Sequence, residues 1–168
     1  MATISKKICL IGDFGVGKTS LIRRFVERQF SDQYLSTVGV KISRRTVELT
    51  GSKPQKMQLL IWDLEGHTKF KSIAPSYLKG ASGAIIVGDV TRQETIDNMP
   101  ERAKLFSDVN PKGIMICALN KSDLADEEKL AKMHEFQDLE QVITTYKTSA
   151  KTGLYVDEIF QKLAYGML

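Results

Sequence analysis

Residues 12–19 combine glycines, a lysine and a threonine at the spacing of a phosphate-binding turn. They fit the pattern G-x-x-x-x-G-K-[ST], and they lie between an apolar strand-like run and a helical stretch, which is the context that the motif requires. Glycines let the backbone curl so that successive N–H groups point at phosphate oxygens, and the start of the helix adds the positive end of its dipole. The segment reads Gly12-Asp13-Phe14-Gly15-Val16-Gly17-Lys18-Thr19.

Lys18 and Thr19 carry the predicted chemistry of this turn. The Lys18 ammonium can bridge the β- and γ-phosphates and is a candidate catalytic group, and the Thr19 hydroxyl can bind Mg²⁺. An ordinary strand-to-helix turn would not explain why these two residues directly follow the last glycine. The motif alone does not separate ATP from GTP. The predicted nucleotide contacts of this segment are Gly15, Val16, Gly17, Lys18, Thr19 and Ser20.

A second polar segment, residues 120–123, is suited to reading a purine base. The Asp123 carboxylate can accept two hydrogen bonds, from N1–H and the 2-amino group of guanine. Adenine offers neither donor and would leave a buried charge unpaired, which is heavily penalised. The Asn120 amide can reach N7 and tie neighbouring loops together, and the Lys121 stem can lie along the base plane. Alone, N-K-x-D is a weak pattern, but it gains specificity after an apolar strand about a hundred residues beyond the phosphate turn.

A third loop, residues 148–151, follows the apolar run 142–147. The backbone N–H of Ala150 could reach the guanine O6, with Ser149 and Lys151 beside it. Taken alone, this segment is equally compatible with a plain loop.

The bulk composition sets the broad class of the protein. The chain has 168 residues, 42% of them hydrophobic, and a net charge of +4, which suits one domain over residues 1–168 and gives no reason to expect nucleic acid. No run approaches the ~20 apolar residues of a membrane span.

Cys9 and Cys117 lie inside apolar runs and are expected to be reduced core residues of a cytoplasmic monomer. Ala2 and the position of Cys117 argue against a lipid anchor in this chain, although a trimmed tail could hide one.

The apolar patterning predicts a mostly parallel sheet with helices on both faces, an α/β fold with about five helices. Together with the phosphate turn, it resembles the doubly wound fold of P-loop NTPases. The connection at residues 50–56 is too short for a crossover helix, so the strands on either side of it should form an antiparallel hairpin at a sheet edge. In such sheets ligands bind at the carboxyl ends of the strands. The six expected strands are 4–11, 40–49, 57–63, 83–90, 114–119 and 142–147, and the helical stretches are 18–29, 68–79, 93–108, 126–138 and 154–165.

With these three motifs in this order, the chain resembles the Ras superfamily of small GTPases, and the neighbouring segments are most similar to the Rab branch. The resemblance runs from about Ser5 to Ala164. It implies a switch cycle between GDP and GTP states, with GTP/GDP and Mg²⁺ as ligands. It also implies that the GTP form binds effectors and regulators through residues 32–45 and 62–77, with any membrane contact made through a partner.

The resemblance places further site residues in two switch segments. Thr37 would sense Mg²⁺ and the γ-phosphate, Asp63 would hold Mg²⁺ through water, and Gly66 would donate its N–H to the γ-phosphate. Phe30 matches the aromatic residue that packs edge-on against guanine, and is otherwise a core residue. Trp62 and Tyr77 match two of the three aromatic residues that Rab proteins present to effectors. The third position is Ile42.

Three residues depart from the family pattern. His67 replaces the glutamine that orients the attacking water, and losing that amide should slow hydrolysis. The alternatives are that His67 positions water, as the histidine of translational GTPases does, or that it faces solvent and takes no part. Phe14 stands where a very small residue is usual, and its ring would crowd the γ-phosphate pocket or turn outward onto the second switch. Glu65 would add like-charge repulsion near the γ-phosphate, bind Mg²⁺ or a water, or point to solvent.

The sequence therefore predicts a guanine-nucleotide switch with slow GTP hydrolysis. The alternative is a nucleotide-locked interaction module without useful turnover. An ATP-dependent P-loop kinase is disfavoured because Asp123 has no partner on adenine.

Overall fold

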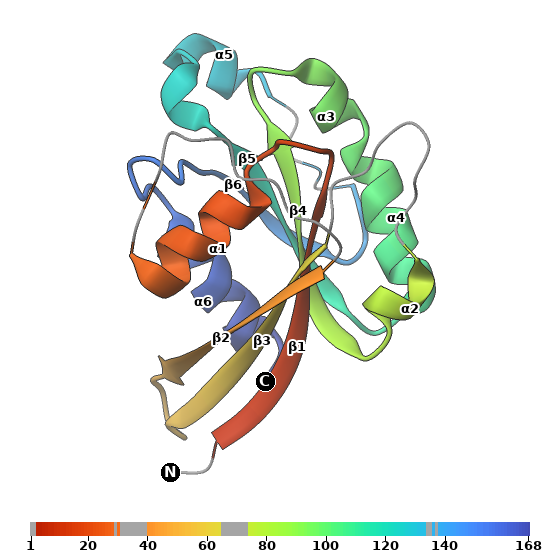
Figure 1. Cartoon of the computed structure of the whole chain (residues 1–168), viewed down its shortest axis with the longest axis vertical. Helices are drawn as coiled ribbons and strands as arrows, with labels where there is room; N and C mark the ends of the chain where they lie inside the picture. The colour runs from red at the N-terminus through yellow and green to blue at the C-terminus, as the bar shows by residue number, and fades with distance from the viewer. Residues whose placement is uncertain (1–2, 29, 31–39, 65–73, 134–135, 137) are drawn as a thin grey trace.

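The structure is a computed structural model that describes residues 3–28, 30, 40–64, 74–133, 136 and 138–168. Within these ranges six strands form one sheet in the order β2-β3-β1-β4-β5-β6, with helices on both of its faces (Figure 1). The strands are β1 (Thr3–Gly12), β2 (Val40–Leu49), β3 (Gln55–Leu64), β4 (Ala81–Asp89), β5 (Ile114–Asn120) and β6 (Val142–Lys147). The helices are α1 (Lys18–Glu27), α2 (Pro75–Leu78), α3 (Gln93–Asp97), α4 (Met99–Val109), α5 (Glu127–Ala131) and α6 (Val156–Gly166), with a 3₁₀ turn at Ser122–Leu124.

The sheet topology confirms the predicted fold class. Strand β1 lies between β3 and β4 and runs parallel to both, and β4, β5 and β6 continue the parallel arrangement. Strand β2 pairs antiparallel with β3 over its whole length and forms one edge of the sheet. The short connection between these two strands leaves no room for a crossover helix, which is why they form a hairpin. The carboxyl ends of the five parallel strands consequently meet at one edge of the sheet, the upper one in Figure 1.

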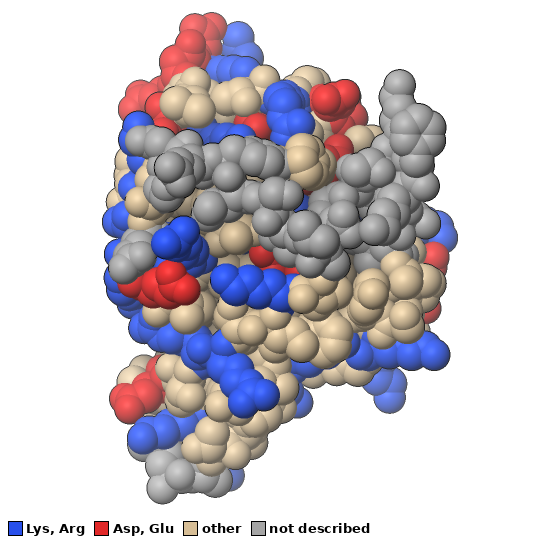
Figure 2. Space-filling view, in the orientation of Figure 1, with Lys and Arg blue, Asp and Glu red and all other residues tan. Residues whose placement is uncertain are grey.

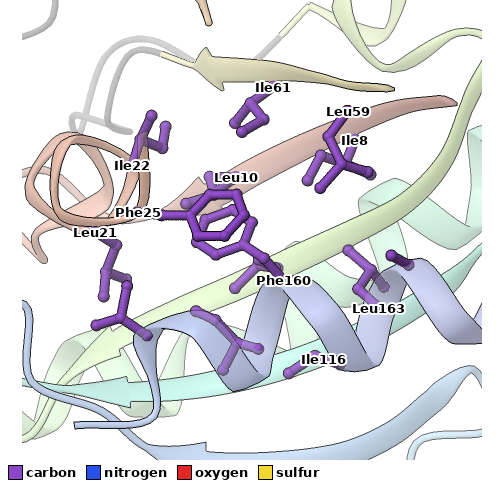
Figure 3. Packing of buried hydrophobic residues seen from close by; sticks show 14 of the residues in the cluster. Ile8, Leu10, Leu21, Ile22, Phe25, Leu59, Ile61, Ile116, Phe160 and Leu163 are labelled. Atoms are coloured by element: carbon purple, nitrogen blue, oxygen red, sulfur yellow. The ribbon is translucent and has the colours of Figure 1, made fainter. Parts of the chain in front are cut away.

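Alternation along β1 divides the core into two clusters. Ile8 and Leu10 belong to the cluster under α1 and α6, whereas Cys9 and Ile11 belong to the cluster under α2, α3 and α4. Across the first cluster the rings of Phe25 and Phe160 stack with centroids 4.1 Å apart (Figure 3), which joins the two helices on that face. Packing on both faces fixes where β1 ends, and the segment that follows it must turn sharply into α1.

Two helical stretches differ from the sequence prediction. Residues 93–108 form two helices, α3 and α4, which meet at Asn98. Pro100 lies in the first turn of α4 and has no N–H to donate to a carbonyl of the preceding turn, so the helix is interrupted there. Among the described residues of the stretch predicted at 126–138, Glu127–Ala131 are helical. Of the stretch predicted at 68–79, residues 74–79 are described, and the helix there is Pro75–Leu78.

The two cysteines are core residues, as predicted. Cys9 and Cys117 are free thiols, both fully buried in the cluster under α3 and α4. Burial raises the pKa of each thiol to about 12, so both stay protonated and unreactive near neutral pH.

Candidate functional site

The phosphate turn is a sharp loop between β1 and α1. Gly15 and Gly17 have φ angles of 75° and 102°, in the left-handed region that glycine adopts without strain. A Cβ at Gly12 would lie 2.4 Å from the carbonyl oxygen of Val87 on β4, so the loop leaves the sheet where only glycine fits. The predicted glycines are therefore required by backbone geometry, and they produce a cradle next to the first turn of α1.

Lys18 points back into this cradle. Its Nζ donates to the carbonyl oxygens of Gly12, at 3.1 Å, and Asp13, at 3.3 Å, and the residue is only 6% exposed. Burial lowers the pKa of Lys18 from its ordinary 10.5 to about 8, while the carboxylates of Asp63 and Asp13 oppose part of that shift. The result is a cation held inside a loop whose geometry suits an anionic group.

A hydroxyl and a carboxylate meet beside the lysine. Thr19 Oγ1 donates to Asp63 Oδ2 at 2.5 Å, and Asp63 is almost fully buried near the end of β3. These are hard oxygen donors of the kind that Mg²⁺ prefers, and they come from the two segments predicted to hold it. The donor set therefore fits a magnesium ion bound next to the phosphate loop. Thr37, the third predicted metal residue, lies outside the described residues.

Asn120 and Lys121 connect the base-reading loop to the phosphate loop. Asn120 Nδ2 donates to the Val16 carbonyl at 3.0 Å, and Asn120 Oδ1 accepts from Thr148 Oγ1 at 3.0 Å. Lys121 Nζ donates to the Gly15 carbonyl at 2.9 Å. The buried Asn120 amide therefore links the segments after β1, β5 and β6. The sequence predicted such a link between neighbouring loops.

The residues predicted to read the base come together at the same edge. Ser149 Oγ donates to Asp123 Oδ1 at 2.7 Å, which fixes the orientation of an otherwise exposed carboxylate. Ala150 is buried next to it, and Arg24 of α1 braces the loop by donating to the carbonyl of Lys151 at 3.2 Å. The 149–151 segment is thus held on two sides, by α1 and by the base-reading loop.

The two aromatic candidates lie in different surroundings. Phe14 is 45% exposed, and its carbonyl oxygen accepts a 2.7 Å hydrogen bond from Arg92 Nη2. Phe30 is half-buried and packs against the core cluster under α1 and α6. Ser20 is half-buried within α1. The remaining departures and switch residues, Glu65, Gly66 and His67, lie outside the described residues.

A set of polar side chains behind the phosphate loop was missed by the sequence analysis. Asp13 accepts from Asn98 and Arg102, and Asp89 accepts from Arg92 and Lys121. No motif marks Asp89, Arg92, Asn98 or Arg102, and Asp13 occupies a variable position of the phosphate motif. The available signal was Arg102, a charged residue at a core-facing helical position three residues after buried Met99 and four before buried Phe106.

The surface charge around the site is mixed. Figure 2 shows Lys and Arg side chains in several separate places on the viewed face, with acidic and uncharged residues between them. Among the residues that the structure describes, no helix is long and apolar enough to cross a membrane.

The fold and the site together define a P-loop nucleotide-binding protein. The sheet is mostly parallel, the glycine-rich turn from β1 into α1 encloses a buried lysine, and a hydroxyl–carboxylate pair lies beside it. Comparison with known proteins gives the family. The Ras family model matches residues 7–168. The chain is 41% identical over 164 residues to Ras-related protein Rab-1C of Dictyostelium discoideum, covering 94% of this chain and 78% of that protein.

Two mammalian relatives agree with this result. Ras-related protein Rab-13 of Mesocricetus auratus is 38% identical over 164 residues, covering 96% of this chain and 79% of the relative. Ras-related protein Rab-31 of Mus musculus is 36% identical over 167 residues, covering 98% of this chain and 84% of that protein. The chain therefore belongs to the Ras family and is a Rab-like small GTPase, a nucleotide-binding switch.

Proposed function

We propose that this protein is a guanine-nucleotide switch that binds GTP and GDP with Mg²⁺ and hydrolyses GTP slowly. The observation that carries the proposal is Phe14. Its side chain is a large, half-exposed group on the phosphate loop itself, outside both core clusters, while the peptide that bears it is fixed through Arg92. A ring at this position obstructs the approach of a water-positioning side chain and of a partner's arginine finger, a contribution worth ~10³–10⁵ in rate.

The sequence of the second switch supports the same proposal. In the sequence His67 stands where the family's water-orienting glutamine is expected, and Glu65 would add a negative charge near the γ-phosphate. Catalysis in this class is mostly positioning and electrostatics, so these changes would slow hydrolysis. In this proposal Lys18 and Gly66 stabilise charge on the γ-phosphate, and His67 is the candidate for orienting water.

Nucleotide and metal binding are assigned to residues of the described loops together with Thr37 of the first switch segment. Mg²⁺ would be held by Thr19, Asp63 and Thr37. The bound ion would act as a Lewis acid and neutralise phosphate charge. The N–H groups of residues 15–20 would surround the phosphates. Asp123, held by Ser149, would select guanine, with Asn120, Lys121, Ala150 and Lys151 around the base and Phe30 at its edge.

Effector binding is assigned to residues 32–45 and 62–77. Ile42 and Trp62 are cross-strand neighbours on β2 and β3, Ile42 is half-exposed, and Tyr77 is exposed on α2. Lys7 Nζ lies 3.6 Å from the Trp62 ring centroid, which holds the indole in place by a cation–π contact. Three large side chains on adjacent elements suit a partner's apolar surface. A cytoplasmic monomer that reaches membranes through a partner completes the proposal.

The test is single-turnover GTP hydrolysis, measured beside a Rab-13 protein under the same conditions. The wild-type chain should hydrolyse GTP at least about tenfold more slowly than Rab-13, and the Phe14→Gly, His67→Gln double variant should recover most of the difference. Ile143→Ala, which removes an exposed apolar side chain from β6, is the matched control and should behave like wild type. A wild-type rate equal to that of Rab-13 would contradict slow hydrolysis.

The same preparation separates the alternatives. If purified protein retains GTP that is never converted, in wild type and in the double variant, the chain is a nucleotide-locked module. If ATP competes as well as GTP for the site, the guanine assignment is wrong.

A further inference from the structure

Arg102 is a buried charge on the inner face of α4. It is 7% exposed, and the neighbouring residues Met99, Ala103 and Phe106 of the same helix are core residues. A guanidinium in such a place requires a partner, since burying an unpaired charge is very costly. Its Nε and Nη2 donate to Asp13 Oδ1 at 3.2 and 2.8 Å. Its buried partner is therefore a residue of the phosphate loop, although the two lie far apart in the sequence. Arg102 Nη1 also lies 3.7 Å from the exposed carboxylate of Glu101.

Asp13 is held from two positions of the helical layer. Its other carboxylate oxygen, Oδ2, accepts from Asn98 Nδ2 at 2.7 Å, and Asn98 lies at the junction of α3 and α4. Asp13 is itself only 9% exposed. On the backbone side, the carbonyl of Asp13 accepts from Lys18 Nζ. One residue thus joins the helices behind the loop to the lysine inside it.

The next two residues of the loop are also held from behind. Arg92 donates to the carbonyl of Phe14 and Lys121 to that of Gly15, and both cations pair with the buried carboxylate of Asp89, at 3.2 and 2.9 Å. Three successive loop residues, Asp13, Phe14 and Gly15, therefore each accept a hydrogen bond from a side chain outside the loop. An ion pair that served stability alone would not need to be placed on the loop whose N–H directions decide phosphate binding.

We propose that Arg102 and Asn98 are positioning residues for the phosphate loop: by fixing Asp13 they hold the loop in the conformation that receives the phosphates of the nucleotide. The proposal deepens the proposed function and rests on nucleotide occupying this loop. It makes a selective prediction, because Arg102 and Asn98 touch no residue assigned to the base. Substituting either side chain should weaken binding of the nucleotide's phosphate groups and leave the discrimination between bases unchanged.

The test measures GDP dissociation rates and the affinities for GDP and IDP, whose base lacks the 2-amino group. Arg102→Met should release GDP about tenfold faster than wild type, because a small displacement of a positioning contact is costly, while the ratio of IDP to GDP affinity stays at the wild-type value. Asn98→Ala, which leaves the Arg102–Asp13 ion pair in place, should also release GDP faster than wild type, but by a smaller factor. Lys104→Met, which removes an exposed cation of the same helix, is the control and should match wild type.

A second variant separates positioning from folding. Replacing both charges, Asp13→Asn with Arg102→Met, avoids an unpaired buried charge and should unfold close to the wild-type temperature, yet still release GDP faster. If folded Arg102→Met and the double variant release GDP at the wild-type rate, or if the IDP to GDP ratio changes with them, the inference is overturned. Failure of the wild-type chain to bind GDP at all would instead refute the proposed function.

Discussion

Lys18 should titrate within the pH range of an ordinary binding assay, and nucleotide affinity should follow its charge. Burial lowers its pKa to about 8, and the nearby Arg102 and Arg92 add to the effect, whereas the carboxylates of Asp63 and Asp13 reduce it. A polyphosphate placed against the ammonium favours the protonated form and raises the pKa in the complex. Binding above pH 8 must therefore take up a proton, and affinity must fall as the pH rises.

The size of the effect follows from the pKa. With a value of about 8, roughly nine in ten molecules carry a charged Lys18 at pH 7 and about a quarter do at pH 8.5. The dissociation constant for GDP should therefore rise about fourfold over this interval. Folding stability changes in the opposite direction: the unfolded chain binds the Lys18 proton more tightly than the nucleotide-free folded chain, so the free energy of unfolding should increase as the pH rises from about 8 to 10.5.

The assay is calorimetric titration of GDP at several pH values in two buffers with different ionisation enthalpies, which gives both affinity and proton uptake. At pH 8.5 the uptake should be about three-quarters of a proton per GDP, falling to about one-tenth at pH 7. Lys18→Arg, whose guanidinium keeps its charge throughout, should lose the uptake wherever it still binds. An affinity independent of pH in wild type, without proton uptake, would refute the assignment of a titrating lysine to the phosphate site.

Three further outcomes are expected from the loops around the site. Thr148→Val should lower the free energy of unfolding by about 1–3 kcal/mol in denaturant titrations, because it leaves the buried Asn120 carbonyl without its donor; an unchanged stability would contradict that role. Gly17→Ala should cost more than about 1 kcal/mol and weaken GDP binding, since its φ is 102° and the new Cβ would lie 2.3 Å from Asn120 Nδ2. Asp123→Asn should shift preference from guanine to xanthine nucleotides in a competition assay, and retained guanine preference would show that another group reads the base.

Much of the fold was predictable because it depends on local patterns. The short connection at residues 50–56 could only join antiparallel strands, and β2 and β3 form that hairpin. The phosphate motif required a strand before it and a helix after it, and the structure has β1 and α1 in those places. The strand ends then determined that the phosphate, metal and base residues would meet at one edge of the sheet.

The helical layer was harder to predict. The apolar periodicity from 93 to 108 is continuous in the sequence, yet the helix divides at Asn98. Pro100 has no backbone N–H to donate, and the Asn98 side chain donates a hydrogen bond to Asp13. In the stretch predicted at 126–138, the helix ends at Ala131 and Phe136 adopts a left-handed backbone with φ of 56°, buried in the core. At Asn98 a local cause, Pro100, acts together with a tertiary contact, whereas at Phe136 burial in the core outweighs local helix propensity.

The sequence by itself determined the class of the protein, the antiparallel hairpin at the sheet edge and the residue types at the nucleotide site, since each is carried by short motifs and apolar spacing. Only the tertiary structure decided which side chains support that site from behind. Asp13 and Arg102 are 89 residues apart and share no motif, so their pairing depends on how α4 packs against the sheet. A sequence pattern reports which faces are buried, whereas the meeting of two distant polar groups depends on the packing of those faces in three dimensions.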